Sequence, residues 1–303
     1  MRILICDPID AEGLEKLRSA GHVVDVKTGL AAEVLVKEVA GYEGLVVRSA
    51  TKVTKAVVDA ATSLKFVMRG GVGLDNIDAA ACEARGIRVL NTPEAATLSV
   101  AEHAIAMMFA AARRIGRAHE LLRQGKWDKK SLVGNEINGK TLGLVGLGRI
   151  GMEVAIRARA LGMTVIANRR NVKTQTPPGV GLVDLNDLLA RADYISIHVP
   201  FTPETRNILG AAEFAKMKKG VILVNCSRGG IVDEGALVAA LRSGAVAMAA
   251  VDVFDEEPPR PDHPLLRLDN VVVTPHIGAS TWEGQNRVGM AVAEKLLEVY
   301  GPA

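Results

Sequence analysis

Short apolar runs alternate with amphipathic stretches along the first hundred residues. Five of these runs have the length and composition of buried strands, and the stretches between them have helical spacing. Strands that alternate with helices predict βαβ units and a parallel sheet. The apolar runs are RILICD, HVVDVK, GLVVRS, KFVMRG and RVLNTP, and the helical stretches are EGLEKLRSA, AEVLVKEVA, KAVVDAATS and DAAACEARG.

A second α/β series follows a long helical stretch. Residues 95–125 predict one long helix, with Ser99 as its N-cap and Glu102 at the capping-box position. The later strands are expected in TLGLV, MTVIANR, DYISIHV, GVILVNCS, AMAAVDVF and NVVVTPH, before a terminal helix. The pattern predicts an α/β protein of two doubly wound parallel-sheet lobes, residues 1–94 plus 277–303 and residues 95–276. We expect an active site between the lobes, because ligands bind at the carboxyl ends of such strands.

Composition narrows the classes of function. Aromatic residues are only 3% of the 303 residues, and 37 basic residues nearly balance 34 acidic ones, so we expect no nucleic-acid partner. Cys6, Cys82 and Cys226 are far apart, which predicts reduced thiols and neither a disulfide nor a metal site. The first apolar run stops at Asp7, too early for a signal peptide, and no run reaches membrane length. We therefore expect a cytoplasmic protein without a membrane partner.

The motif GLGRIG follows an apolar run and precedes a helical pattern. In this context G-x-G-x-x-G predicts a dinucleotide-binding loop. Gly146 would allow the tight turn, Gly148 the approach of the pyrophosphate, and Gly151 the packing of helix on strand. Arg149 and Ile150 lie inside the same loop and are counted with it as cofactor contacts.

The stretch TVIANRR lacks the acid that usually binds the ribose hydroxyls of NAD about twenty residues after the loop. Asn168, Arg169 and Arg170 stand there instead. Arginine offers a planar fork that matches phosphate, and no carboxylate would repel a 2′-phosphate. The sequence therefore predicts a preference for NADP(H), with NAD(H) still possible if Arg169 stacks on adenine or points into solvent.

Three further stretches supply polar side chains after apolar strands: NCSRGGIVDE, VDVFDEEP and TPHIGAS. With GLGRIG they resemble, in sequence and order, the D-isomer-specific 2-hydroxyacid dehydrogenase family, over essentially the whole chain. The resemblance implies a Rossmann cofactor domain, a flavodoxin-like substrate domain and hydride transfer between nicotinamide and a 2-hydroxyacid. VVRSATKVT, MRGGVGLDNID and NTPEAATLSVAEH carry a closer likeness to the phosphoglycerate dehydrogenase branch, here expected without a regulatory domain.

The resemblance assigns roles to individual residues. Arg228 would hold the carboxylate and carbonyl of the substrate, and His276 would be the general acid in reduction and the base in oxidation. Glu257, which the family pattern selects over Glu256 because it directly precedes a proline, would orient His276. Asp252 would accept a hydrogen bond from the nicotinamide carboxamide. Further expected cofactor contacts are Val72, His198, Val199 and Cys226, the last as a small packing residue.

Substrate contacts are expected in the first lobe. The loop of Arg69, Gly70, Gly71 and Val72 would bring backbone N–H groups to a carboxylate, and Arg48 and Arg69 match positions that contact substrate in the resembling branch. A phosphorylated acid needs additional cations, for which Arg48, Lys52 and Arg69 are candidates, although Lys52 is equally typical of a solvated surface. By the same resemblance, Lys129 matches a basic residue that reaches the site of the neighbouring subunit, and the long helix near residues 98–124 predicts a homodimer through the cofactor domain.

Three functions remain open from the sequence. The first is oxidation of 3-phosphoglycerate to 3-phosphohydroxypyruvate toward serine. The second is reduction of hydroxypyruvate or glyoxylate, which the arginine in place of the usual acid favours. The third is a dinucleotide-sensing, corepressor-like binding protein. The complete set of Arg228, Glu257 and His276 favours an enzyme.

Overall fold

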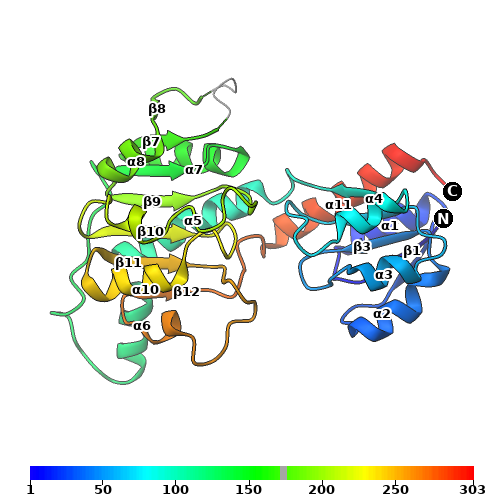
Figure 1. Cartoon of the computed structure of the whole chain (residues 1–303), viewed down its shortest axis with the longest axis horizontal. Coiled ribbons are helices and arrows are strands. Elements are labelled where there is room, and N and C mark those ends of the chain that lie inside the picture. Colours follow the sequence, from blue (N-terminus) through cyan, green and yellow to red (C-terminus); the bar gives the residue numbers. More distant parts are fainter. Residues whose placement is uncertain (171–175) are drawn as a thin grey trace. The chain divides into compact units, whose positions relative to one another are not determined.

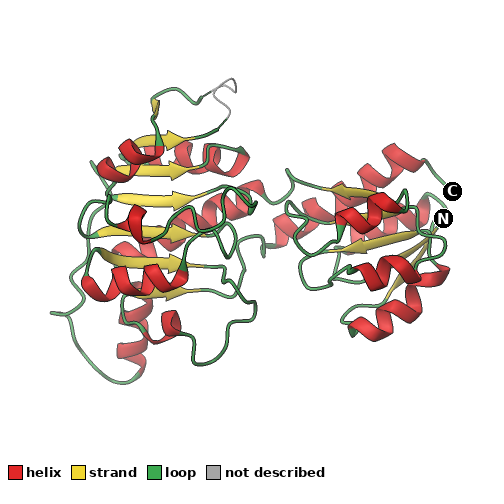
Figure 2. Cartoon of the chain, in the orientation of Figure 1, coloured by secondary structure: helices red, strands yellow, loops and turns green. Residues whose placement is uncertain are grey.

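The computed structural model describes residues 1–170 and 176–303, and these divide into two compact units. The first unit contains Met1–Thr97 and Ala279–Ala303, and the second contains Leu98–Gly278. Each unit has its own sheet with helices on both faces (Figures 1 and 2). The predicted α/β class with two parallel sheets is confirmed.

The first unit has a five-stranded parallel sheet in the order β2-β1-β3-β4-β5, which is the flavodoxin-like order. Leu35, Val57 and Cys82 mark the core on one face, and Leu17 and Val292 mark the core on the other. Because both faces are covered, the strands read as continuous apolar runs. The elements are β1 (Arg2–Ile5), α1 (Ala11–Ser19), β2 (Val23–Val26), α2 (Ala32–Glu38), η1 (Val39–Gly41), β3 (Gly44–Val47), α3 (Lys55–Ala60), β4 (Phe66–Arg69), α4 (Ala79–Ala84), β5 (Arg88–Asn91) and α11 (Trp282–Tyr300).

The second unit has a seven-stranded parallel sheet in the order β12-β11-β10-β9-β6-β7-β8. This is a doubly wound order: from β6 the chain adds β7 and β8 on one side, then returns to add β9 to β12 on the other, so the switch point lies between β6 and β9. Successive residues of each strand face opposite sides of the sheet and enter different cores, as Leu144 and Val145 of β6 do. Helices α5 and α7 cover one face, and α8, α9 and α10 cover the other. The sheet therefore brings the carboxyl ends of its strands to one edge.

The elements of the second unit agree with the predicted strands and add β8 and α9, which no apolar run indicated. They are α5 (Thr97–Ala112, whose first residue falls in the first unit), α6 (Ile115–Arg123), β6 (Thr141–Val145), α7 (Arg149–Ala160), β7 (Thr164–Asn168), β8 (Val180–Leu182), α8 (Leu185–Arg191), β9 (Tyr194–Ile197), α9 (Ala211–Phe214), β10 (Val221–Asn225), α10 (Glu234–Ser243), β11 (Val246–Val251), η2 (Pro264–Arg267) and β12 (Val271–Val273).

The prediction of one long helix over residues 95–125 is wrong. The structure has two helices, α5 and α6, because Arg114 adopts the left-handed conformation (φ 55°) and interrupts the helical backbone. The N-cap assigned to Ser99 is also wrong. Helix α5 begins at Thr97, whose N–H donates to the carbonyl of Glu94 in the preceding turn, and Ser99 is buried inside the helix.

Candidate active site

The glycine loop connects β6 to α7 at the carboxyl edge of the second sheet. Gly146 has a φ of 102°, and a Cβ there would lie 2.5 Å from the carbonyl oxygen of His198, so only glycine fits. A Cβ on Gly151 would lie 2.4 Å from the carbonyl oxygen of Gly146. Beside Gly148 the space is open. The glycine loop is therefore closely packed at Gly146 and Gly151 and open at Gly148. Because it lies at the N-terminus of α7, it fits the pyrophosphate of a dinucleotide.

Arg149 and Ile150 occupy the first turn of α7, where backbone N–H groups lack intrahelical acceptors. Arg149 is exposed and Ile150 is half-buried. The carbonyl of Val199 accepts a 2.5 Å hydrogen bond from the Ser227 hydroxyl. Burial lowers the pKa of His198 to about 4, and its Nε2 lies 2.9 Å from the hydroxyl of Ser196. His198 is therefore neutral, and its backbone lies against Gly146 of the glycine loop.

The residues in place of the ribose-binding acid follow β7. Asn168 ends the strand and donates from Nδ2 to the carbonyl of Val183 at 3.2 Å. Arg169 is half-buried, and its Nη2 donates to the hydroxyl of Thr176 at 2.8 Å. Arg170 is exposed. The guanidinium of Arg169 is therefore fixed at the carboxyl end of β7, and Thr176 is a partner that the sequence did not indicate.

Asp252 follows β11 and is 1% exposed. Its Oδ1 accepts from the hydroxyl of Thr274 at 2.5 Å and from the N–H of Ile277 at 2.9 Å, and Oδ2 accepts from the N–H of Gly278 at 2.9 Å. Burial opposes ionisation, but these donors and His103 together hold the pKa of the carboxyl below its usual range. Asp252 is thus a buried anion whose hydrogen bonds connect the end of β11 to the residues after β12.

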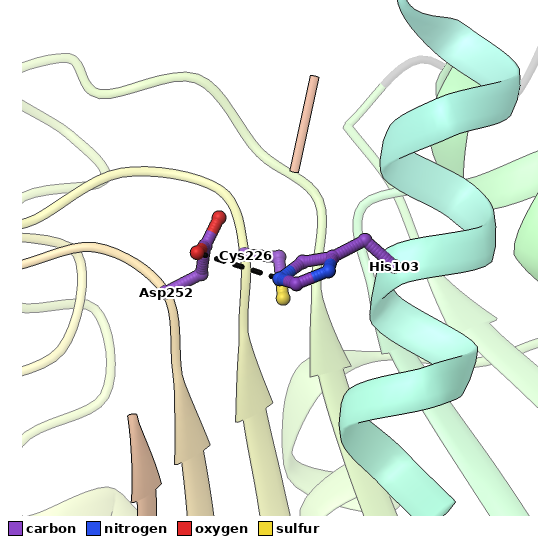
Figure 3. Close-up of side chains that lie close together, drawn as sticks. All are labelled: His103, Cys226 and Asp252. Carbon is purple, nitrogen blue, oxygen red and sulfur yellow. Dashed lines mark ion pairs between the residues drawn. The ribbon is translucent and has the colours of Figure 1, made fainter. Parts of the chain in front are cut away.

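Cys226 follows β10, Asp252 follows β11 and His103 lies within α5, and their side chains lie close together (Figure 3). The Nε2 of His103 is 3.4 Å from Oδ1 of Asp252. The three side chains have donor types that bind zinc, but the carboxylate already accepts three hydrogen bonds and burial strongly raises the pKa of the Cys226 thiol. The cluster fits a buried hydrogen-bonded group better than a metal site. His103 was missed in the sequence, because it is one of several polar residues in the first half of this helix and no spacing distinguishes it.

His276 and Glu257 form a close pair in the second unit. The Nδ1 atom of His276 lies 2.6 Å from Oε2 of Glu257, while the N–H of Phe254 donates to the other oxygen, Oε1, at 3.1 Å. Burial raises the cost of ionising Glu257, but the bond and charge of His276, the Phe254 amide and the charge of Arg228 hold the pKa of Glu257 below its usual range. A carboxylate on Nδ1 leaves Nε2 of the ring to exchange a proton.

The backbone at His276 has φ 52°, a left-handed conformation that non-glycine residues rarely adopt. Its N–H donates to the carbonyl of Asp252 at 2.8 Å. Both side chains of the pair remain about one-third exposed, at 34% for His276 and 36% for Glu257. A rare backbone conformation held by Asp252 is typical of a side chain placed for function rather than for packing.

Arg228 lies in the loop after β10. Asn225, the last residue of β10, shapes this loop by donating from Nδ2 to the carbonyl of Arg228 at 3.1 Å and by accepting from the N–H of Ser227 at 3.1 Å. The Nη1 of Arg228 donates to the carbonyl of Ser227 at 2.7 Å. A half-buried guanidinium near the carboxylate of Glu257 suits the binding of a substrate carboxylate.

The predicted substrate contacts of the first unit lie after β3 and β4. Arg48 is half-buried, its N–H donates to Asp7 at 2.5 Å, and burial lowers its pKa although the Asp7 charge opposes this. A Cβ on Gly71 would lie 1.4 Å from Nη1 of Arg69, so that guanidinium lies directly against the Gly71 backbone. Gly70 is buried and its N–H donates to Val47. The remaining candidates of this group, Val72, Lys52 and, in the second unit, Lys129, are exposed.

The matches to known proteins agree with this geometry. The model of the D-isomer specific 2-hydroxyacid dehydrogenase NAD binding domain matches residues 105–278. The chain belongs to the D-isomer specific 2-hydroxyacid dehydrogenase family, as its motifs predicted. Its second unit is therefore a nicotinamide-cofactor domain. No described helix is both long and apolar enough to cross a membrane.

Individual relatives cover the whole chain. It is 52% identical to D-3-phosphoglycerate dehydrogenase of Archaeoglobus fulgidus over 99% of its own length and 57% of that protein. It is 48% identical to hydroxypyruvate reductase of Thermotoga maritima over 99% of its own length and 98% of that protein. The chain thus spans little more than half the length of the phosphoglycerate dehydrogenases that it matches.

Solved structures give the same fold. The TT0316 protein from Thermus thermophilus superposes with a TM-score of 0.90 at 39% identity, covering 100% of this chain and 98% of that one. A glyoxylate reductase gives a TM-score of 0.87 at 33% identity, covering 99% and 96%.

Proposed function

We propose that this protein is a dehydrogenase that interconverts a D-2-hydroxyacid and its 2-oxo acid with a nicotinamide cofactor, NADP(H) in preference to NAD(H). The observation that carries the proposal is the 2.6 Å contact between Nδ1 of His276 and Oε2 of Glu257, in the same unit as the glycine loop. The cofactor supplies or accepts the hydride. The protein has to bind both molecules and move one proton.

The side chains divide this work between them. In reduction, Nε2 of His276 would give a proton to the carbonyl oxygen of the 2-oxo acid as the hydride arrives at carbon. Glu257 would stabilise the protonated ring from Nδ1 and fix its orientation. Arg228 would bind the carboxylate in a bidentate geometry and so align the carbonyl. Oxidation would run the same proton transfer backwards, with the neutral ring of His276 as the base.

The preference for NADP(H) rests on Arg169 at the end of β7. Its half-buried guanidinium is fixed by Thr176 and would bind a 2′-phosphate, with Arg170 beside it. Hydrogen bonds to charged groups contribute about 1.5–3 kcal/mol. Arg169→Asp should therefore lower kcat/KM for NADPH about 10- to 100-fold and raise it for NADH. Arg191→Ala, an exposed arginine paired with Asp187 on α8, is the matched control.

The cofactor proposal has a clear opposing outcome. If the wild-type protein uses NADH as well as or better than NADPH, Arg169 does not select the cofactor and the preference is wrong.

For the substrate, 3-phosphoglycerate and 3-phosphohydroxypyruvate are the first candidate. Relatives at 52% and 47% identity bear the name D-3-phosphoglycerate dehydrogenase, and Arg48 and Arg69 supply cations beside the glycines of the first unit. A phosphate dianion would need such cations. Hydroxypyruvate or glyoxylate is the second candidate. It is supported by the hydroxypyruvate reductase that the chain matches over nearly its full length, and by the arginine at position 169.

One comparison separates the two substrates. We would measure kcat/KM for 3-phosphohydroxypyruvate and for hydroxypyruvate with saturating NADPH, in the wild type and in Arg48→Ala. A phosphate-binding role predicts a preference for the phosphorylated acid that Arg48→Ala removes. A preference for hydroxypyruvate that survives the substitution would assign the protein to the second candidate. Absence of turnover with every 2-oxo acid would instead favour a dinucleotide-sensing role.

We also propose that the chain forms a homodimer through the region of α6 and the residues after it. Large apolar side chains are exposed there: Ile115 at 53%, Leu122 at 59%, Trp127 at 84% and Val133 at 76%. Lys129 lies in the same stretch. Light scattering should give twice the chain mass of 32.1 kDa. Trp127→Asp should shift the protein toward the monomer, and a monomeric wild type would refute this.

A further inference from the structure

The loop after β11, residues 252–258, is in contact with two histidine–glutamate pairs. One is His276 and Glu257, and the other is His263 and Glu234. The N–H of Asp255 donates to Oε1 of Glu234 at 3.0 Å, next to the Phe254 amide that serves Glu257. The other oxygen of Glu234, Oε2, lies 2.9 Å from Nε2 of His263. Two consecutive amides of one loop are therefore bound by two carboxylates, each of which also pairs with a histidine.

The second pair, Glu234 and His263, is the more enclosed of the two. Its side chains are 18% and 16% exposed, and the His263 ring packs edge-on against Phe254 with centroids 5.6 Å apart. Among the described residues, Nδ1 of His263 is buried without a hydrogen-bond partner. An N–H on Nε2 that donates to Glu234 fits this environment, because an N–H on Nδ1 would be a buried, unsatisfied donor. The pair is suited to holding the loop rather than to exchanging protons.

The same loop is bound to the loop that carries Arg228. Oδ1 of Asp255 accepts from the N–H of Gly230 at 2.6 Å. A Cβ on Gly229 would lie 1.9 Å from the carbonyl oxygen of Phe254, so the two backbones are in direct contact. Glu234 opens α10, immediately after the Arg228 loop, and reaches across to Asp255. The carboxylates of Glu234 and Asp255 therefore link the loops after β10 and β11 in both directions.

We propose that Glu234 and His263 are positioning residues: through Asp255 they hold Glu257, and with it His276, at the correct place relative to Arg228. The inference rests on the proposed function, because it concerns the residues that act in it. Loss of the pair should affect the reaction step more than cofactor binding. A displacement of about 1 Å in an acid or base is enough to change a rate by up to about 100-fold.

The test compares Glu234→Ala with Glu234→Gln. The alanine variant loses the acceptor for the Asp255 amide, whereas glutamine keeps an oxygen for it. We expect Glu234→Ala to lower kcat about 10-fold, with the Kd for NADPH within about twofold of wild type, and Glu234→Gln to recover most of the loss. Asp193→Ala is the matched control, because Asp193 also accepts a backbone amide, that of Thr141, and pairs with a second side chain, at the start of β9.

A second readout needs no turnover. In histidine-labelled protein, the ¹⁵N chemical shift of Nδ1 in His276 reports its hydrogen bond to Glu257. Glu234→Ala should change this shift, and Asp193→Ala should leave it unchanged. An unchanged kcat and an unchanged His276 signal in Glu234→Ala would overturn the inference, even if that variant melts at a lower temperature. A wild type without 2-oxo acid reductase activity would overturn the proposed function alone, since the NMR comparison still tests the positioning.

Discussion

Replacing Glu257 by glutamine tests the charge of the pair that Glu257 forms with His276, with little change of shape. Glutamine retains an oxygen that can accept from Nδ1 of His276, but its negative charge is gone. A hydrogen bond to a charged group contributes about 1.5–3 kcal/mol, against about 0.5–1.5 kcal/mol for a neutral one. The pair is about one-third exposed, at 34% and 36%, so solvent screens part of the difference. We take about 1 kcal/mol as the loss for the protonated ring.

This loss has a defined effect on the pH profile. In the proposed mechanism, reduction needs the protonated form of His276, and about 1 kcal/mol corresponds to about 0.7 pH unit. In Glu257→Gln, the pH at which kcat/KM for reduction falls to half should move down by about that amount. Above the midpoint the variant should be about fivefold slower, and well below the midpoint it should approach wild type.

The assay is NADPH oxidation at 340 nm, with kcat/KM obtained at each pH from the dependence of the rate on the concentration of the 2-oxo acid. Glu256→Gln is the control, because Glu256 is the adjacent, exposed glutamate and should leave the profile unchanged. A uniform loss of activity at every pH, without movement of the midpoint, would refute the electrostatic role of Glu257 and leave it only a positional one. An unchanged profile would refute both.

Three further predictions concern the same unit. His276→Ala should lower kcat by about 10²–10⁴, and a variant with most of its activity would refute the acid–base assignment. Asp252→Asn should destabilise the fold by about 2–4 kcal/mol in urea unfolding, because an amide nitrogen would face a backbone donor. Since the folded-state pKa of Asp252 is depressed, its stabilisation is complete above the ordinary value of about 3.9 and is lost as pH falls through the folded-state pKa; the asparagine variant should lack this dependence. Gly146→Ala should cost about 1–3 kcal/mol and weaken NADPH binding, measured by cofactor fluorescence, whereas unchanged binding would contradict the close fit.

Much of the fold follows from local patterns in the sequence. Continuous apolar runs such as VILVN of β10 mark strands buried on both faces, and glycine in a strand–helix context marks the cofactor loop. Short exposed elements such as β8 carry no such pattern and were missed. The break at Arg114 was also missed, because a left-handed arginine leaves no mark in hydrophobic periodicity.

The residues of the site also differ in whether the sequence could indicate them. Glu257 and His276 could be identified because they lie in recognisable stretches after apolar strands. Glu234 lies in one of those stretches too, yet its contact with His263 spans 29 residues and depends on how two loops pack. His103 approaches Asp252 across 149 positions of sequence for the same reason, and no spacing rule connects a helix to a distant strand end in this way.

In the parallel sheet of the second unit, the residues proposed for cofactor selection and those proposed for the reaction lie at the ends of different strands, so that evolution could change one group without the other. The residues proposed to select the cofactor lie at the end of β7, whereas those proposed to bind the substrate and to move the proton follow β10, β11 and β12. The two groups therefore lie on different loops of the sheet. Under the proposed assignment, substitutions after β7 would exchange one cofactor for another while Glu257 and His276 stay unchanged. A lineage with this sheet would then adapt to a change in its supply of reduced cofactor by altering few positions.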